Sequence, residues 1–268
     1  GEIHNGIMTW QDGTVSSGDW KLIHDSDFSG ILCGKGDDLL GCGTLFLPGN
    51  VCYEGELKHT NPTSGTLVFP NRRISMDAPA FRTAWNLLMK MERYRGSFFG
   101  DWSPDGYPEQ GSFTFSNGDK VCGRFSYSCS EAYTGMLRNG RACGIGSHPL
   151  AEHMTRTGEF LEGDCVGNVT VKHECGAYFF GRWYKGQVPE GTLYYTDGSN
   201  KFSRNWTWAE TKLRSGNIIR GLFCDHHKQA CGIGTVLFPS MEMEFRGEVR
   251  NGDTRSGSQY DMEGNLLP

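Results

Sequence analysis

The residues best suited to chemistry in this chain are two cysteines and two histidines near its C-terminal end. Cys224, His226, His227 and Cys231 lie close together, and two thiolates with two imidazoles are suitable ligands for zinc. Their spacing matches no standard zinc finger, and adjacent histidines rarely bind the same ion. Cys231 also belongs to a segment, Ala-Cys-Gly-Ile-Gly, that occurs at 142–146 and again at 230–234. We therefore expect a repeat position rather than a metal ligand, and we expect no cofactor.

Two other patterns could suggest catalysis. Residues 34–38, Gly-Lys-Gly-Asp-Asp, resemble a fragment of a phosphate-binding loop, but they lack its full glycine spacing and its Ser or Thr. Acidic pairs occur at Asp37-Asp38 and at Glu162 with Asp164, with nothing to suggest that either pair converges in a dry pocket. No signature of a serine hydrolase, a zinc protease or a catalytic cysteine is present. The sequence predicts that the protein is not an enzyme.

Charge and composition restrict the partners. The formal net charge is −5, and the longest cationic run is Arg72-Arg73. Nucleic-acid and anionic-lipid binding both favour clustered Lys and Arg, so we expect no nucleic-acid partner and no direct contact with membrane lipid. No apolar stretch approaches the roughly 18 residues of a spanning helix. The ten cysteines show no CxxC spacing, which favours reduced thiols and a cytoplasmic location.

A fixed spacing of short motifs dominates the chain. The central residue advances from 135 to 158, 181 and 204, a step of 23 each time, in four segments: Tyr133–Leu137, Arg156–Phe160, Phe179–Trp183 and Phe202–Trp206. A constant period of this length is typical of repeat architectures. A second motif, Gly-Thr/Ser-apolar-x-apolar, recurs at 43–47, 65–69, 111–115, 191–195 and 234–238.

Both motifs alternate with a period of two, as β-strands do. Asn117-Gly118 and Asp197-Gly198 are strong hairpin turns between them, so each period predicts one β-hairpin. The central glycine leaves a hole on the apolar face, which we expect an aromatic ring from the neighbouring strand to cover. Arg204 replaces that glycine in the fourth segment and should disturb the ladder locally.

These motifs resemble the MORN repeat, in which Tyr-x-Gly-x-Trp is followed by a glycine-rich turn and Gly-x-Gly-x-Tyr. The best matches are Tyr53–Leu57, Tyr133–Gly140 and Gly232–Pro239. The resemblance spans residues 1–268 as about nine divergent hairpins. It implies an all-β, single-layer antiparallel β-hairpin solenoid with one short helical insertion.

The repeat pattern is interrupted twice. At about 77–93 we predict a helix, with Asp77 as a cap, Pro79 in the first turn, and Phe81, Trp85 and Leu88 on one face. This helix either folds back to cover the sheet or presents that face to a partner. The second interruption is predicted at about 207–217.

The resemblance also implies a function. MORN proteins serve as non-catalytic scaffolds in cytoskeletal or membrane-associated assemblies, so we expect a cytoplasmic adaptor that binds protein partners and that can form a homodimer through the strand edge at Phe245 to Tyr260. The alternatives are an accessory module of a lipid kinase or lysine methyltransferase, and a phosphoinositide-binding module. We predict that partners bind an aromatic groove lined by Tyr53, Tyr94, Phe98, Tyr133, Phe160, Phe179, Trp183, Phe202 and Trp206.

Overall fold

The computed structural model describes residues 2–9, 15–24, 28–33, 40–58, 61–151, 153–184, 187–204, 206–212, 216–224 and 231–268. These residues are mostly β, in three antiparallel sheets (β1 to β7, β8 to β17 and β18 to β22), and contain one α-helix. The predicted all-β organisation in antiparallel hairpins is confirmed. The chain divides into two compact units, one of residues 1–114 with 118–126 and one of residues 115–117 with 127–268.

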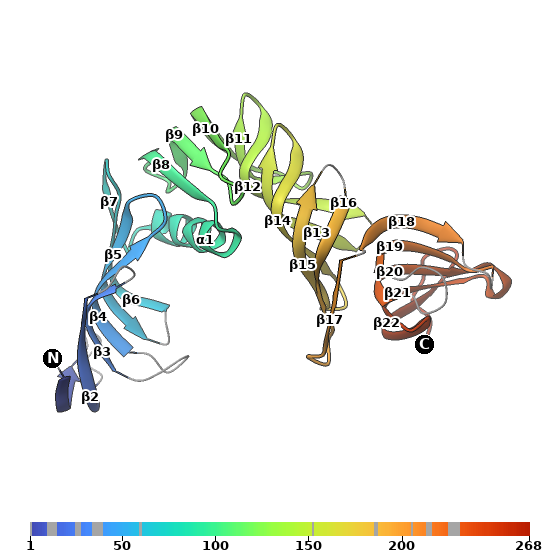
Figure 1. Cartoon of the computed structure of the whole chain (residues 1–268), viewed down its shortest axis with the longest axis horizontal. Helices are drawn as coiled ribbons and strands as arrows, with labels where there is room; N and C mark the ends of the chain where they lie inside the picture. The colour runs from blue at the N-terminus through green and yellow to red at the C-terminus, as the bar shows by residue number, and fades with distance from the viewer. Residues whose placement is uncertain are drawn as a thin grey trace. The chain divides into compact units, whose positions relative to one another are not determined.

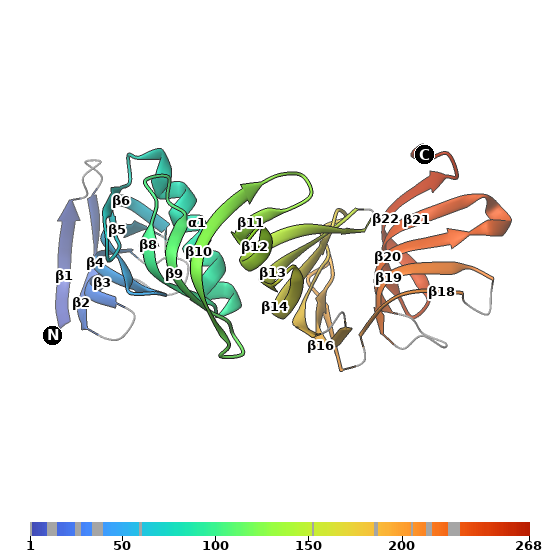
Figure 2. The same cartoon turned by 90° about the horizontal axis from the view of Figure 1, so that it is seen from above.

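The first unit contains the N-terminal sheet, the helix and three further strands (Figures 1 and 2). Strands β1 to β7 pair with their neighbours in chain order, and so do β8 to β10. They are β1 (Glu2–Thr9), β2 (Val15–His24), β3 (Phe28–Cys33), β4 (Leu40–Leu47), β5 (Val51–Lys58), β6 (Asn61–Val68), β7 (Arg73–Ser75), β8 (Ser97–Trp102), β9 (Pro108–Thr114) and β10 (Lys120–Cys129).

Helix α1 (Pro79–Tyr94) lies where the sequence predicted a helix. Proline suits the first helical turn, because the missing N–H would have no helical partner there. The N-cap is Ala78 and forms no side-chain cap bond, so the expected cap at Asp77 is wrong. The helix ends at Arg95, whose left-handed conformation lets its N–H donate to the Glu92 carbonyl.

The second unit contains two runs of consecutive strands. The first run is β11 (Thr134–Arg138), β12 (Arg141–Ala151), β13 (Met154–Leu161), β14 (Asp164–His173), β15 (Tyr178–Tyr184), β16 (Gln187–Tyr194) and β17 (Asn200–Ser203). The second is β18 (Thr207–Lys212), β19 (Ile218–Cys224), β20 (Cys231–Phe238), the 3-10 turn η2 (Pro239–Met241), β21 (Met243–Arg250) and β22 (Asp253–Asp261). A buried cluster joins side chains of both runs, including Phe179, Leu193, Trp206, Leu222 and Ile233.

Aromatic rings lie over pairs of glycines that face each other across two strands. Gly55 pairs with Gly65, and Gly181 pairs with Gly191. A Cβ added at Gly65 would lie 2.9 Å from the Tyr53 hydroxyl oxygen, and one at Gly191 would collide with the Phe179 ring. The same arrangement places Phe28 over Gly43, Tyr133 over Gly146 and Phe245 over Gly257. We call this the ring-over-glycine contact.

This contact corrects one sequence-based expectation. The covering ring was expected to come from the neighbouring strand, but it comes from the glycine's own strand, two residues earlier. The reason is that residues i and i+2 share a face of a strand, so a large side chain at i can lean along the strand over the empty site at i+2. The ring then covers the opposite glycine as well.

Part of the second interruption of the repeat, predicted at about 207–217, adopts regular structure. Thr207–Lys212 forms β18, which pairs along its whole length with β19, from Thr207 opposite Phe223 to Lys212 opposite Ile218. This part of the 207–217 segment is therefore regular strand. The change of sheet falls just before it, since β17 ends at Ser203, next to Arg204. Phe202 has no glycine two residues later and is 56% exposed.

Buried polar side chains fasten hairpin turns to later strands. Glu159 accepts hydrogen bonds from the backbone N–H groups of Ser116 (2.6 Å) and Asn168 (3.3 Å) and from the Ser116 hydroxyl. Glu248, which also follows a motif glycine, accepts one from the Thr196 N–H at 2.6 Å. Ser116 and Thr196 lie at the starts of the two predicted Asn-Gly and Asp-Gly turns. These carboxylates, both fully buried, therefore satisfy turn donors that the strand ladder leaves open.

None of the helices in the described residues is both long enough and apolar enough to cross a lipid bilayer.

Replacing Gly181 by Ala should destabilise the second unit. The added methyl group would collide with the Phe179 ring and with the Glu190 carbonyl oxygen, and relieving such overpacking costs about 1–3 kcal/mol. Urea unfolding followed by tryptophan fluorescence measures the loss. The neighbouring exposed Arg182→Ala is the control, with an expected change within about 0.5 kcal/mol. Equal effects of the two substitutions would contradict the ring-over-glycine contact.

Replacing Glu159 by Gln should alter the dependence of stability on pH. Burial raises the pKa of Glu159, although hydrogen bonds from Ser116 and Asn168 lower it in part. The native state therefore binds more protons than the unfolded chain above about pH 4.3, the ordinary glutamate value. The stability contributed by this group is fully present below that pH and is lost as the pH rises through the native pKa.

Urea unfolding of wild type and Glu159→Gln at a series of pH values tests this. The free energy of unfolding of wild type, minus that of the variant, should fall as the pH rises above about 4.3. A constant difference would show that the pKa of Glu159 is the same in the native and unfolded states. A rising difference would show that the native pKa is lower than the unfolded one.

Candidate functional site

The nine residues predicted to line a groove occupy different positions. Seven are buried: Tyr53, Tyr94, Phe98, Phe160, Phe179, Trp183 and Trp206. Tyr133 is half-buried and Phe202 is exposed. The buried rings contact one another, as Phe179 does with Trp206 at 5.3 Å between ring centroids, and Trp206 Nε1 donates to the Gly191 carbonyl at 2.9 Å. These seven side chains stabilise the interior, so they do not form an open groove.

Helix α1 packs against the sheet of its own unit. Phe81 and Leu88 are buried, together with Ala84, Leu87 and Met91. The rings of Phe81 and Trp85 meet Tyr53 of β5 edge-on, at centroid distances of 6.1 and 5.6 Å. Of the two roles considered for this helix, covering the sheet is the one that the structure shows. Trp85 differs from the other two predicted partner residues, because it is only half-buried.

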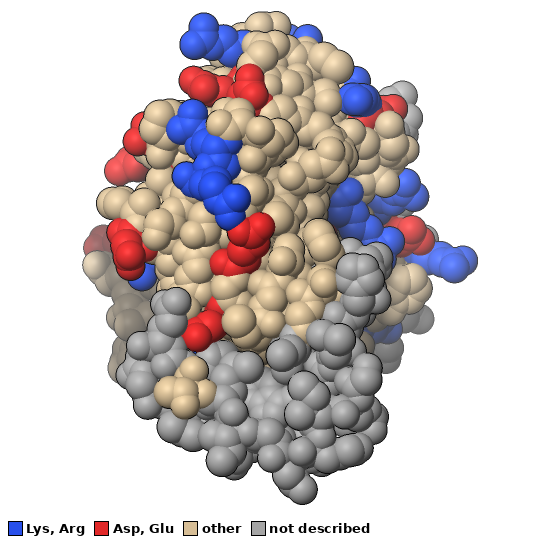
Figure 3. Space-filling model, turned by 90° about the vertical axis from the view of Figure 1, so that its left-hand side faces the viewer, with Lys and Arg blue, Asp and Glu red and all other residues tan. Residues whose placement is uncertain are grey.

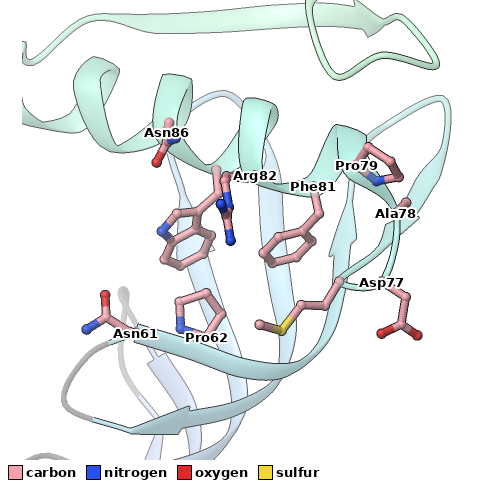
Figure 4. A pocket seen from close by; sticks show the side chains of 10 residues that line it. Asn61, Pro62, Asp77, Ala78, Pro79, Phe81, Arg82 and Asn86 are labelled. Atoms are coloured by element: carbon pink, nitrogen blue, oxygen red, sulfur yellow. The ribbon is translucent and has the colours of Figure 1, made fainter.

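A cavity of about 680 Å³ lies between the first half of α1 and the start of β6. This volume falls within the usual range for ligand sites, about 300–1,000 Å³. Phe81 and Arg82 extend from the helix toward it, and Pro62 lies opposite on β6 (Figure 4). The lining residues are Asn61, Pro62, Met76, Asp77, Ala78, Pro79, Phe81, Arg82, Trp85 and Asn86.

The aromatic wall of this cavity packs against Tyr53 of β5. Phe81 and Trp85 lie one helical turn apart, with parallel rings 6.0 Å between centroids and 7° between planes. Tyr53 supports both rings, and its single hydroxyl proton is shared between the Glu56 carbonyl oxygen (2.8 Å) and the Ser64 carbonyl oxygen (2.7 Å). Burial raises the pKa of Tyr53 to about 12, and at neutral pH the hydroxyl is protonated, as in an ordinary tyrosine.

Charge in the cavity comes from Arg82 and Asp77, both exposed. Within the described part of the chain, Arg82 makes no hydrogen bond or ion pair. An unpaired guanidinium beside aromatic rings can bind a carboxylate while apolar groups of the same ligand pack on the rings. The side-chain amides of Asn61 and Asn86 add donors and acceptors for a peptide backbone. This set of groups is suited to binding a peptide segment that carries a carboxylate and an apolar side chain.

The surface around this unit carries mixed charge. Figure 3 shows Lys and Arg side chains interspersed with Asp and Glu on the described part of one face. Arg73, for example, pairs with Glu54. Such a mixture lacks the concentrated positive field that attracts a polyanion.

The remaining candidates from the sequence are the metal ligands, residues 34–38 and the acidic pair Glu162 with Asp164. In the described residues no group of three or more His, Cys, Asp or Glu side chains could hold a metal ion. Cys224 and Cys231 are buried, whereas His226 and His227 lie outside the described residues, as do residues 34–38. Glu162 pairs with Arg138 at 3.0 Å, which accounts for one member of the acidic pair with Asp164.

The strand edge expected to form a dimer is partly covered by the chain itself. The C-terminal residues fold back on β22, with the Leu267 N–H donating to the Gln259 carbonyl and the Asp261 N–H to the Asn265 carbonyl. Tyr260 and Leu266 form an isolated bridge. Only the stretch Asp253–Ser258 of this edge lies beyond these contacts, so the edge left for a second copy is shorter than residues 245–260 suggested.

No protein-family model matches the chain, and no curated protein is similar to it. The sequence pointed to Phe81 and Trp85 but missed Asn61, Pro62 and Arg82. Arg82 and Asn86 share the four-residue spacing of Phe81 and Trp85, so the helical pattern could have located them on an adjacent face. No comparable sequence pattern marks Asn61 and Pro62, which line the cavity from β6.

Proposed function

We propose that this protein is a non-catalytic scaffold that binds a segment of a protein partner in the cavity between α1 and β6. The observation that carries the proposal is the combination there of a half-buried Trp85, stacked on Phe81, with the unpaired Arg82. Aromatic residues and arginine are the types most enriched where protein partners bind tightly. The partner segment that suits this site carries an apolar side chain and a carboxylate.

The repeat pattern supports a scaffold of the MORN type. The phased glycines, the rings that cover them and the hairpin turns recur along the chain, and an extended array of hairpins of this kind would be a solenoid. We propose that the chain is a divergent member of this group, located in the cytoplasm within a cytoskeletal or membrane-associated assembly. Self-association would use the Asp253–Ser258 edge of β22.

Charge reversal at the cavity tests the proposal. Tagged wild type, Arg82→Glu and Trp85→Ala are used to purify partners from cells of the source organism, followed by quantitative mass spectrometry. A stoichiometric partner should be retained by wild type and lost with both variants, since one loses the ion pair and the other loses the packing surface. Arg93→Glu, an exposed charge reversal near the other end of α1, is the matched control.

Circular dichroism and urea unfolding should show all four proteins folded. If the same partners bind Arg82→Glu and Trp85→Ala as strongly as wild type, the cavity is not the binding site. If Arg93→Glu loses the partner equally, binding depends on the general charge of the helix.

A further inference from the structure

We propose that Cys224 and Cys231 are a redox modification site, at which a hydroperoxide converts the two thiols into a reversible disulfide. This inference is independent of the binding site at α1. It depends on the pairing of β19 with β20 and on the surroundings of the two sulfur atoms.

The strand register places the two cysteines directly opposite each other. Cys224 is the last residue of β19, Cys231 is the first residue of β20, and they are cross-strand partners. Opposite residues of antiparallel strands have Cα atoms about 4.5 or 5.5 Å apart. Disulfides need Cα separations of about 4.4–6.8 Å, so the Cα separation of either pairing geometry lies within that range.

Both side chains point to the same face of the sheet. They belong to one buried cluster, which also contains Tyr195, and Cys224 is 0% and Cys231 6% exposed. Tyr195 hydrogen-bonds with Cys231 and interacts electrostatically with both thiols. The strand register therefore places both thiols on this face of the sheet, in the same buried cluster as Tyr195.

A cysteine at the corresponding place in an earlier repeat lacks such a partner. Cys143 lies in the same Ala-Cys-Gly-Ile-Gly segment and is also buried. Neither of the strands flanking it, β11 and β13, contains a cysteine. The pair at 224 and 231 is therefore not a consequence of the repeat itself, and Cys143 is an internal control for burial.

The chemistry balances with one hydroperoxide. One thiolate attacks the peroxide and breaks the O–O bond, giving a sulfenic acid and, from hydrogen peroxide, one water. The second thiol attacks that sulfur, forms the S–S bond and expels hydroxide, which leaves as water with the thiol proton. Two thiols and one hydrogen peroxide thus become one disulfide and two waters.

Oxidation would change contacts around the C-terminal sheet. The Cys231 thiol donates to Asn251 Oδ1 at 3.6 Å, and the Asn251 N–H donates to Cys231 Sγ at 3.4 Å. Tyr195 also lies near Cys231, and the Arg250 guanidinium carbon lies 3.8 Å from the centroid of the Tyr195 ring. Arg250 pairs in turn with Asp197 and with the buried Glu248. Forming the disulfide removes the Cys231 thiol proton and with it the hydrogen bond to Asn251 Oδ1. This hydrogen bond lies next to the contacts between β21 and the 195–199 turn.

Peptide mapping of the intact chain tests the proposal. The protein is treated with hydrogen peroxide, the remaining thiols are alkylated, and the unfolded chain is digested with trypsin. Cleavage after Lys228 separates the two cysteines into peptides 221–228 and 229–246, so a disulfide links two peptides. We expect that linked pair to form, dithiothreitol to release it, and Cys143 in peptide 142–156 to remain alkylated.

Cys224→Ser and Cys231→Ser should each abolish the linked pair, while Cys143→Ser should leave it unchanged. If either of the first two variants fails to fold, the wild-type map still decides. Full alkylation of both cysteines after peroxide, irreversible oxidation of either one without linkage, or equal linkage to Cys143 would overturn the proposal.

Discussion

The contact on which this structure depends is an aromatic ring that covers two glycines facing each other across a strand pair. The ring needs both glycines, because a Cβ at either position would occupy its place. This requirement sets the strand register, since Gly55 must stand opposite Gly65 and Gly181 opposite Gly191. β17, the last strand of its sheet, ends next to Arg204, which replaces the glycine that Phe202 would cover.

The same contact buries several of the aromatic side chains. Tyr53, Phe98 and Phe179 are fully buried by covering glycines and touching neighbouring rings. In the first unit, helix α1 leaves one aromatic side chain, Trp85, only half-buried beside a cavity. Phe81 and Trp85 of the helix meet Tyr53 edge-on, and Tyr53 is itself a ring that covers glycines, so the fold and the candidate site share one residue.

Local patterns predicted the strands, the hairpin turns and the helix, because alternation, Asn-Gly or Asp-Gly pairs and Pro79 act over a few residues. The direction of the rings was not predictable from spacing alone, since a side chain at i can lean along its own strand or across to the next. The sequence did not predict that Asn61 and Pro62 line the cavity, because their place there depends on how α1 packs against the sheet. Cys224 and Cys231 were considered as zinc ligands, a role that their spacing did not favour, and the strand register shows that they are cross-strand partners.

The most direct measurement of the ring-over-glycine contact is a double-mutant cycle between Tyr133 and Gly146. All three of the nearest atoms to a Cβ added at Gly146 belong to the Tyr133 side chain, so the cost of that methyl group depends on the ring. Unfolding free energies of wild type, Gly146→Ala, Tyr133→Ala and the double variant give the coupling. Gly146→Ala should destabilise wild type but be nearly neutral without the ring, with a coupling energy of about 1–3 kcal/mol. The same cost in both backgrounds would contradict the account.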